Sequence, residues 1–432
     1  MSLDTSFGDG GIVFSNIVDA SYNYINSIQT YNDKIIISGY SSDASGDRVF
    51  IASYNSNGTL DTSFGVNGYI YPENYYSFSS PNSKTIIVLS TGIIILSCLD
   101  NSNVINLLFY NSNGTLNKQI NTSYTANNVY FSSILKYKDS DNFVLTFNVN
   151  NSYWYYRRYD SNGDGISDLI QTNFDNNSSN YFCLCNTIDY SNNIIFGGRQ
   201  NLGPGATPNL HMFEVFGSDD TNIIGLTSYA SGNNVTGYTS TTTDTSNNII
   251  LVGNFSNYFL VRKYDSSGNF ITMNNTILGN AYTSDVVIDT NGKIIISLTK
   301  NIGDYDSLYL VKLNSDLTLD TTFGNNGTIL TDISNNDFEV RNIFLQSDGK
   351  ILTSATFTQE YYDASGEYVS EEDKYVILRY LNSSIPNTDP DLSELITNII
   401  KNKKLILFNI TSIGKNNYKL PTTEANFITK LL

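Results

Sequence analysis

Seven apolar runs of similar composition recur along this 432-residue chain, the first of them at Lys34 to Tyr40. Their apolar cores begin at Ile35, Ile94, Phe143, Ile194, Ile249, Ile294 and Ile351. A repeat of about fifty residues, built from strand-like pieces, indicates one supersecondary unit used over and over. The seven copies therefore predict an all-β fold in which small sheets are arranged radially and close on themselves.

The first copy shows the whole unit. A strand at residues 24–31 leads through a turn to the apolar run, and a hairpin loop at 41–47 leads to a second strand at 49–54. A short last strand follows at 68–71, which makes four strands per unit. The apolar run does not alternate with polar residues, because a strand between two neighbouring sheets is covered on both faces.

A second marker also occurs seven times, at the end of the strand that follows each run. It is clearest in Phe109 to Gly114, Arg158 to Gly163 and Lys263 to Gly268, and looser near Phe216, Leu313 and Tyr380. Its Asn-Gly and Asp-Gly steps supply the positive φ of tight turns. Two markers that agree strengthen the prediction of seven units.

The segment Leu-Asp-Thr-Ser/Thr-Phe-Gly begins at Leu3, Leu60 and Leu319, and the seventh unit lacks it. The chain starts with the piece that its last unit needs. We therefore expect residues 11–14 to form an outer strand beside residues 375–379, which closes the array and removes an open sheet edge.

The pattern Gly-x-Leu-Asp-x-x-Phe-Gly-x-x-Gly, with a Gly-Lys-Ile-Ile-type strand about thirty residues later, resembles the delta-60 repeat family of β-propellers. Gly58 to Gly68, Gly292 to Ile294, Leu319 to Gly327 and Asp348 to Ile351 carry the resemblance. Units two to five depart from it, as in Leu116-Asn117-Lys118-Gln119. The resemblance implies a seven-bladed β-propeller over residues 1–384, with residues 1–14 completing the last blade, and it implies no catalytic residue. The Asn, Ile, Tyr and Lys bias is similar to that of proteins from AT-rich genomes such as those of giant amoeba-infecting viruses.

Residues 385–432 have a different pattern. After Pro386 to Pro390, the apolar residues Leu392, Leu395, Ile396, Ile399 and Ile400 follow a helical period, and residues 405–410 read as a strand. We expect a small α+β appendage that packs either on the propeller or on another protein. The whole chain has a formal net charge of −17. Because the appendage carries +2, residues 1–384 carry −19. Such an acidic body disfavours nucleic acid and anionic membrane surfaces as partners.

The cysteines are few: Cys98, Cys183 and Cys185. An odd and sparse set predicts no disulfide framework and a reducing compartment. Cys183 and Cys185 alternate along an apparent strand and are expected to share one face. Neither a signal peptide nor an apolar segment long enough to span a bilayer is visible, so we expect a cytoplasmic or virion location.

The clearest candidate site is the string Asp160 to Asp168. Its possible calcium ligands are Asp160, Asn162, Asp164, Ile166 through its carbonyl, and Asp168, with Gly165 permitting the sharp bend. The string is similar to the calcium loops of integrin-type propellers. It also occupies the ordinary turn between two strands of the third unit, and position twelve is Gln171 rather than Glu. The alternatives are a structural Ca²⁺ site and a plain Asp-Gly turn.

Catalytic patterns are not apparent. His211 is the only histidine, and no Gly-x-Ser-x-Gly motif accompanies it, so we expect a non-enzymatic protein. The expected function is a scaffold for protein–protein interaction, through residues 385–432 or through two long hairpin loops at 199–208 and 360–374. A virion or particle-associated component is one form of this function. The alternatives are a hydrolase or lactonase with a metal in the central channel, and a glycan-binding propeller that uses exposed tyrosines and Trp154.

Overall fold

The computed structural model describes residues 3–14, 17, 20–43, 46–76, 83–125, 132–149, 153–175, 181–200, 210–230, 235–255, 258–277, 279, 281–302, 305–331, 338–362 and 368–382. These residues lie in one compact unit, Met1–Asn382. Their regular secondary structure is β, and the described part of the chain contains no helix that could cross a membrane. The expected helix and strand of residues 385–432 lie outside the described residues.

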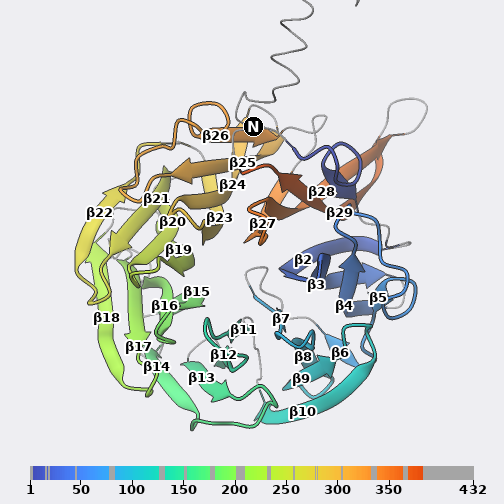
Figure 1. The fold of residues 1–432 in the computed structure, drawn as a ribbon, viewed down its shortest axis with the longest axis horizontal. Helices are drawn as coiled ribbons and strands as arrows, with labels where there is room; N and C mark the ends of the chain where they lie inside the picture. The colour runs from blue at the N-terminus through green and yellow to red at the C-terminus, as the bar shows by residue number, and fades with distance from the viewer. Residues whose placement is uncertain are drawn as a thin grey trace, which may run out of the picture. The chain divides into compact units, whose positions relative to one another are not determined.

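Six sheets follow one another along the chain, and all but one of their strand pairs are antiparallel (Figure 1). The largest joins the last residues to the first, in the order β27-β28-β29-β2-β3-β4-β5, with β1 also on β29. Its strands are β27 (Phe338–Leu345), β28 (Ile351–Tyr362), β29 (Tyr368–Tyr380), β1 (Ile12–Phe14), β2 (Ala20–Tyr31), β3 (Lys34–Asp43), β4 (Gly46–Tyr54) and β5 (Tyr69–Ile70). The second sheet contains β6 (Tyr75–Tyr76), β7 (Ile86–Val88), β8 (Ile94–Asp100), β9 (Val104–Tyr110) and β10 (Leu116–Thr125).

The remaining four sheets have four strands each, paired in sequence order. The third and fourth contain β11 (Ser132–Lys136), β12 (Phe143–Val149), β13 (Tyr153–Tyr159), β14 (Ile170–Asp175), β15 (Tyr181–Ile188), β16 (Ile194–Gln200), β17 (Leu210–Phe216) and β18 (Asn222–Ala230). The fifth and sixth contain β19 (Val235–Thr243), β20 (Ile249–Phe255), β21 (Tyr258–Tyr264), β22 (Phe270–Asn274), β23 (Ala281–Ile288), β24 (Ile294–Ile302), β25 (Tyr305–Leu313) and β26 (Thr328–Thr331).

All seven apolar runs lie at the start of a strand, in β3, β8, β12, β16, β20, β24 and β28. Their lack of alternation has the expected cause. Ile35 and Ile37 enter one core cluster while Ile36, on the opposite face of β3, enters another. All three side chains are at most 3% exposed, so each face of this strand is covered by a neighbouring sheet.

The expected pairing of the first residues with the last is confirmed. Strand β1 runs antiparallel to β29, with Val13 opposite Ile377. Asp4 and Arg379 reinforce the junction through a buried ion pair of 2.9 Å. The sequence motif that begins at Leu3 thus lies beside the strand that ends at Tyr380, because Leu3 and Tyr380 form an isolated β-bridge.

The recurring Leu-Asp-Thr-Ser/Thr-Phe-Gly segment is a tight turn with a buried anchor. Its phenylalanines, Phe7, Phe64 and Phe323, are at most 1% exposed. In the second copy, Asp61 accepts hydrogen bonds from the backbone and hydroxyl of Ser63, and Gly65 adopts a φ of 53°. Glycine is needed there because a side chain at this φ is strained and would meet the carbonyl of Tyr69.

Three local predictions were wrong. The first hairpin loop is shorter than 41–47, because β3 continues to Asp43 and β4 begins at Gly46. Most of the predicted acidic loop at 360–374 is strand, since β28 runs to Tyr362 and β29 starts at Tyr368. Cys183 and Cys185 do not share a face: a register shift between them on β15 sends them into different core clusters. Residues 201–209 of the other predicted loop lie outside the described residues.

Candidate functional site

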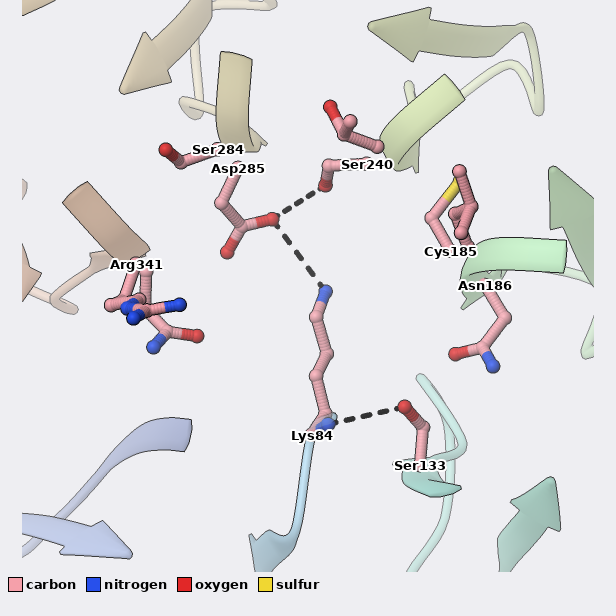
Figure 2. Close-up of a pocket in the computed structure, with 11 residues that line it drawn as sticks. Lys84, Ser133, Cys185, Asn186, Ser240, Ser284, Asp285 and Arg341 are labelled. Carbon is pink, nitrogen blue, oxygen red and sulfur yellow. Dashed lines mark hydrogen bonds and ion pairs between the residues drawn. The ribbon is translucent and has the colours of Figure 1, made fainter. Parts of the chain in front are cut away.

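A polar cluster forms where the innermost strands of the sheets converge (Figure 2). Register shifts interrupt β2, β15, β19, β23 and β27 at one equivalent place, just before Ser27, Cys185, Ser240, Asp285 and Asn342. An extra residue in one strand of a pair re-aims a side chain out of the alternating pattern. The residues at four of these shifts, Leu184, Thr239, Ser284 and Arg341, all line the central cluster.

Lys84 and Asp285 are the charged pair of this cluster. Figure 2 shows the Lys84 side chain extended across the space toward Asp285 on β23, with 3.8 Å between Nζ and Oδ1. Ser240 donates a hydrogen bond of 2.5 Å to the same oxygen, and the N–H of Ile343 donates to Oδ2 at 3.3 Å. Because these donors come from three further segments of the chain, the carboxylate of Asp285 connects several inner strands.

The central cluster has little room for a ligand and few groups that could hold a metal ion. Its side chains leave a cavity of ≈ 10 Å³, which is room for about one water molecule. Its one carboxylate already has an ammonium partner, and the guanidinium of Arg341, which is paired with Glu339, also lines the cluster. A hard cation prefers several oxygen ligands and is repelled by two nearby cationic side chains. The cluster is thus built to join strands.

The Asp160 to Asp168 string forms the turn between β13 and β14. Asp160 Oδ1 accepts the backbone N–H groups of Asn162 and Asp164, each at 2.9 Å. Asp265 makes the same pattern in the turn after β21, so the turn closes through its own hydrogen bonds. Among the described residues, no group of three or more His, Cys, Asp or Glu side chains is gathered as at a metal site. Calcium binding here stays a prediction.

His211 lies in β17 and is completely buried. Its ring lies against that of Tyr238, tilted by 33° with 4.6 Å between centroids, and neither imidazole nitrogen has a hydrogen-bond partner. Burial, together with the nearby Arg262 guanidinium, lowers the pKa of His211 to about 3. Burial likewise raises the thiol pKa of Cys183 and Cys185. None of these groups is placed or charged as a nucleophile or general base near neutral pH.

Larger cavities are also present, and one of them shares Ser284 and Arg341 with the central cluster. One of ≈ 540 Å³ lies among the turns near Arg379 and Lys350, and one of ≈ 430 Å³ lies beside Arg341 and Tyr282. A third, of ≈ 850 Å³, lies between β4 and the segment that joins β5 to β6. Trp154, named as a glycan-binding candidate, does not reach a surface cavity, because its side chain is 3% exposed in a core cluster.

The sequence reasoning missed the central cluster, although a signal for it exists. In six of the seven units, a buried polar residue lies eight to ten residues before the start of the apolar run, at the equivalent place of the innermost strand. These residues are Ser27, Thr85, Ser133, Ser240, Asp285 and Asn342, and Cys185 takes this place in the fourth unit. A polar residue that recurs at this place indicates a shared position at the inner end of the sheets. The partners that these residues find could not be read from the spacing.

Comparison with protein families is consistent with this architecture. A family described as a "Domain of unknown function (DUF5122) beta-propeller" matches residues 32–64 and 290–323. Both segments run from the turn before an apolar run to the phenylalanine of the Leu-Asp-Thr segment, and both fold here as two paired strands followed by a tight turn. Two segments of the chain thus match a β-propeller family. A comparison with curated proteins finds no match.

A comparison with solved structures also finds matches. Polysaccharide lyase Uly1 matches with a TM-score of 0.51 and 10% identity, over 82% of this chain and 90% of its own. Two peptidases match less well: Pyrococcus horikoshii acylaminoacyl peptidase (TM-score 0.47, 10% identity, 83% and 54% of the chains) and Galerina marginata prolyl oligopeptidase B (0.44, 12%, 78% and 46%). This chain spans about half the length of these peptidases. At such identities the likeness shows the fold alone.

Proposed function

We propose that this chain is a seven-bladed β-propeller of the delta-60 repeat kind, closed by its N-terminal strand, that serves as a non-enzymatic scaffold for protein partners. A part in a virus particle is one version of this role. A structural Ca²⁺ ion in the Asp160 turn and partner contacts through residues 385–432 belong to the same proposal. Neither nucleic acid nor a membrane is expected as a partner, because residues 1–384 carry a net charge of −19.

Hydrogen bonds between neighbouring units support the proposal of seven blades in a closed circuit. Ser38 meets Thr85 at 2.6 Å, and Ile134 donates its N–H to Lys84 at 2.8 Å. Farther along, Asn186 donates to Thr146, Cys185 to Tyr238, Ser240 to Asp285 and Ser284 to Val340. The last contact returns to the beginning, because Asn342 on β27 donates a hydrogen bond of 3.1 Å to the carbonyl of Ile25 on β2.

One observation favours a scaffold over the hydrolase alternative: among the described residues, the side chains that meet in the central cluster are paired with one another. An enzyme with its metal in the channel needs several oxygen ligands around an open position. Here the channel holds Lys84 against Asp285 and leaves a cavity of ≈ 10 Å³. The cavities of ≈ 540 and ≈ 850 Å³ lie beside turns and connecting segments, where proteins usually make contacts.

The two functions are separated by one pair of measurements. The full chain is assayed for lactone and ester hydrolysis with Ca²⁺, Zn²⁺ and Mn²⁺, alongside Asp285→Asn, and is also used as bait in extracts of its source. We expect no metal-dependent turnover and one protein recovered at a fixed ratio. Turnover that depends on metal and disappears in Asp285→Asn would establish the hydrolase instead.

A further inference from the structure

The cavity of ≈ 850 Å³ between the first and second sheets has an aromatic lining. Tyr71, Tyr75 and Tyr76 line it, together with Pro72, Arg48, Glu73, Asn74 and Gly46. Tyr71 follows strand β5 while Tyr75 and Tyr76 form strand β6, so the rings come from two adjacent sheets. Its volume falls in the range of about 300–1,000 Å³ that is usual for small-ligand sites.

The wall beneath Tyr71 is rigid. Tyr375, which is completely buried, stacks on Phe50 at 5.5 Å, and Phe50 contacts Tyr71 at 6.4 Å. Tyr69 also stacks on Tyr71 at 5.9 Å between centroids. A row of rings therefore runs from the core to the cavity and holds Tyr71 in place. A side chain held by packing loses little conformational freedom when a ligand binds, which favours affinity.

The opposite wall offers an accessible ring. Tyr76 is 40% exposed, and β6 fixes its backbone by pairing Tyr75 with Asp100 and Tyr76 with Leu99 on β8. The ring of Tyr76 is thus available to a ligand while its strand stays anchored. An exposed tyrosine offers both an apolar face and a hydroxyl group, which suits ligands that carry both kinds of surface.

The charges in the cavity select the class of ligand. Arg48 lies over the Tyr71 ring, with Cζ 4.7 Å from the centroid, so the place where a cationic ligand would stack is already taken. Arg48 and Glu73 balance each other, and the chain as a whole carries −17, which disfavours a polyanion. A neutral ligand with polar edges and an apolar face remains.

We propose that this cavity, defined by Arg48, Tyr71, Glu73, Tyr75 and Tyr76, binds a neutral carbohydrate. The C–H face of a sugar ring stacks on a tyrosine ring, and neighbouring hydroxyl groups pair with planar side chains such as guanidinium, carboxylate and amide. Arg48, Glu73 and Asn74 supply these groups at the edge of the aromatic surface. This inference does not depend on the scaffold function.

A proline-rich peptide is the competing occupant, because such peptides also dock in aromatic-lined grooves. The sugar is favoured because charged and amide side chains stand beside the rings in the cavity, where vicinal hydroxyl groups can use several donors and acceptors at once. An extended proline-rich segment has few hydrogen-bond donors to offer these charged and amide side chains.

The test is calorimetric titration of the full chain. The probes are neutral oligosaccharides of glucose, mannose, galactose, xylose and N-acetylglucosamine, with alginate oligosaccharide and a polyproline peptide as competitors of other classes. We expect at least one neutral oligosaccharide to bind, and Tyr76→Ala and Arg48→Ala each to weaken that binding about tenfold or more. The matched control is Tyr190→Ala, which removes a ring that is 49% exposed and outside this cavity.

Melting curves of all variants confirm that each is folded. If no neutral oligosaccharide binds at millimolar concentration, the proposal is overturned. Binding confined to alginate or polyproline would also overturn it. The same holds if Tyr76→Ala binds the sugar as strongly as the control Tyr190→Ala.

Discussion

Asp4 and Arg379 connect the two ends of the described chain through side chains that are 8% and 5% exposed. Arg379 also donates to the carbonyl of Ser56 and to the hydroxyl of Ser6, and its guanidinium lies 4.5 Å over the Phe7 ring. A buried pair of this kind does not guarantee net stability, but the loss of one member leaves the other charge buried without its partner.

Asp4→Asn is therefore expected to lower the free energy of unfolding by about 3 kcal/mol, as measured by urea denaturation. Burial alone would raise the pKa of Asp4, but hydrogen bonds from Ser6 and the charges of Arg379 and Lys350 outweigh it and lower the pKa. A carboxyl whose pKa is lowered in the folded state stabilises above its unfolded value, near pH 4, and loses that effect as the pH falls through the folded value. The deficit of Asp4→Asn should disappear in strong acid.

The control for this prediction is Asp9→Asn, because Asp9 is exposed in the same N-terminal segment. It should change the unfolding free energy by less than about 0.5 kcal/mol. Equal losses in the two variants would show that the ion pair does not hold the junction.

His211 makes a second prediction at the residue scale. Its pKa of about 3 in the folded state lies below the usual value near 6.5, so the unfolded chain binds a proton that the folded chain excludes. Stability should fall as the pH drops from 7 to 5, by about 2 kcal/mol. His211→Phe should remove this slope, and it should keep the stability at pH 7 because the imidazole nitrogens have no partner to lose. Since the chain has no other histidine, an unchanged slope would contradict the prediction.

At the scale of elements, β1 decides whether β29 has an open edge. Deletion of residues 1–14 removes the three-residue pairing with β29, the buried Phe7 side chain and the partner of Arg379. We expect a loss of at least about 5 kcal/mol in the free energy of unfolding, and self-association visible by size-exclusion chromatography. Deletion of residues 1–2 is the control and should have neither effect. A truncated chain that stays monomeric and stable would refute the role of β1.

The turn between β13 and β14 provides the calcium prediction. If Asp160, Asp164 and Asp168 bind Ca²⁺, the melting temperature in millimolar calcium should exceed that in chelator, because a ligand that binds only the folded state stabilises it. The double change Asp164→Asn and Asp168→Asn should abolish the difference. Asp265→Asn, in the equivalent turn after β21, should preserve it. Equal melting temperatures for the unmodified chain in calcium and chelator would remove this site.

At the scale of the whole molecule, hydrogen bonds join neighbouring sheets, and Asn342 on β27 donates a hydrogen bond to Ile25 on β2. Open repeat arrays can unfold stepwise, because each unit contacts only its neighbours and the ends fray. The closed circuit that we propose has no free end from which such fraying could begin. We expect residues 1–382 to unfold in one calorimetric transition, with calorimetric and van't Hoff enthalpies in agreement. Separate transitions for groups of sheets would show that the circuit is open.

The sequence alone was sufficient for what local pattern controls. The seven apolar runs start strands as predicted, and the motif at Leu3 led to the pairing of β1 with β29. These features follow from alternation, turn residues and the covering of both strand faces, which are properties of short stretches of chain. The position of the Asp160 turn was equally predictable, because Asp-Gly steps set the backbone there.

Only the tertiary structure decided which side chains meet. A register shift that separates Cys183 from Cys185, the approach of Lys84 to Asp285, the burial of Trp154 and the cavity beside Tyr76 all depend on how one sheet lies against the next. The contacts involved join residues far apart in sequence, and no local pattern encodes them. Strand identity is a property of a segment, whereas a binding cavity is a property of the space between segments.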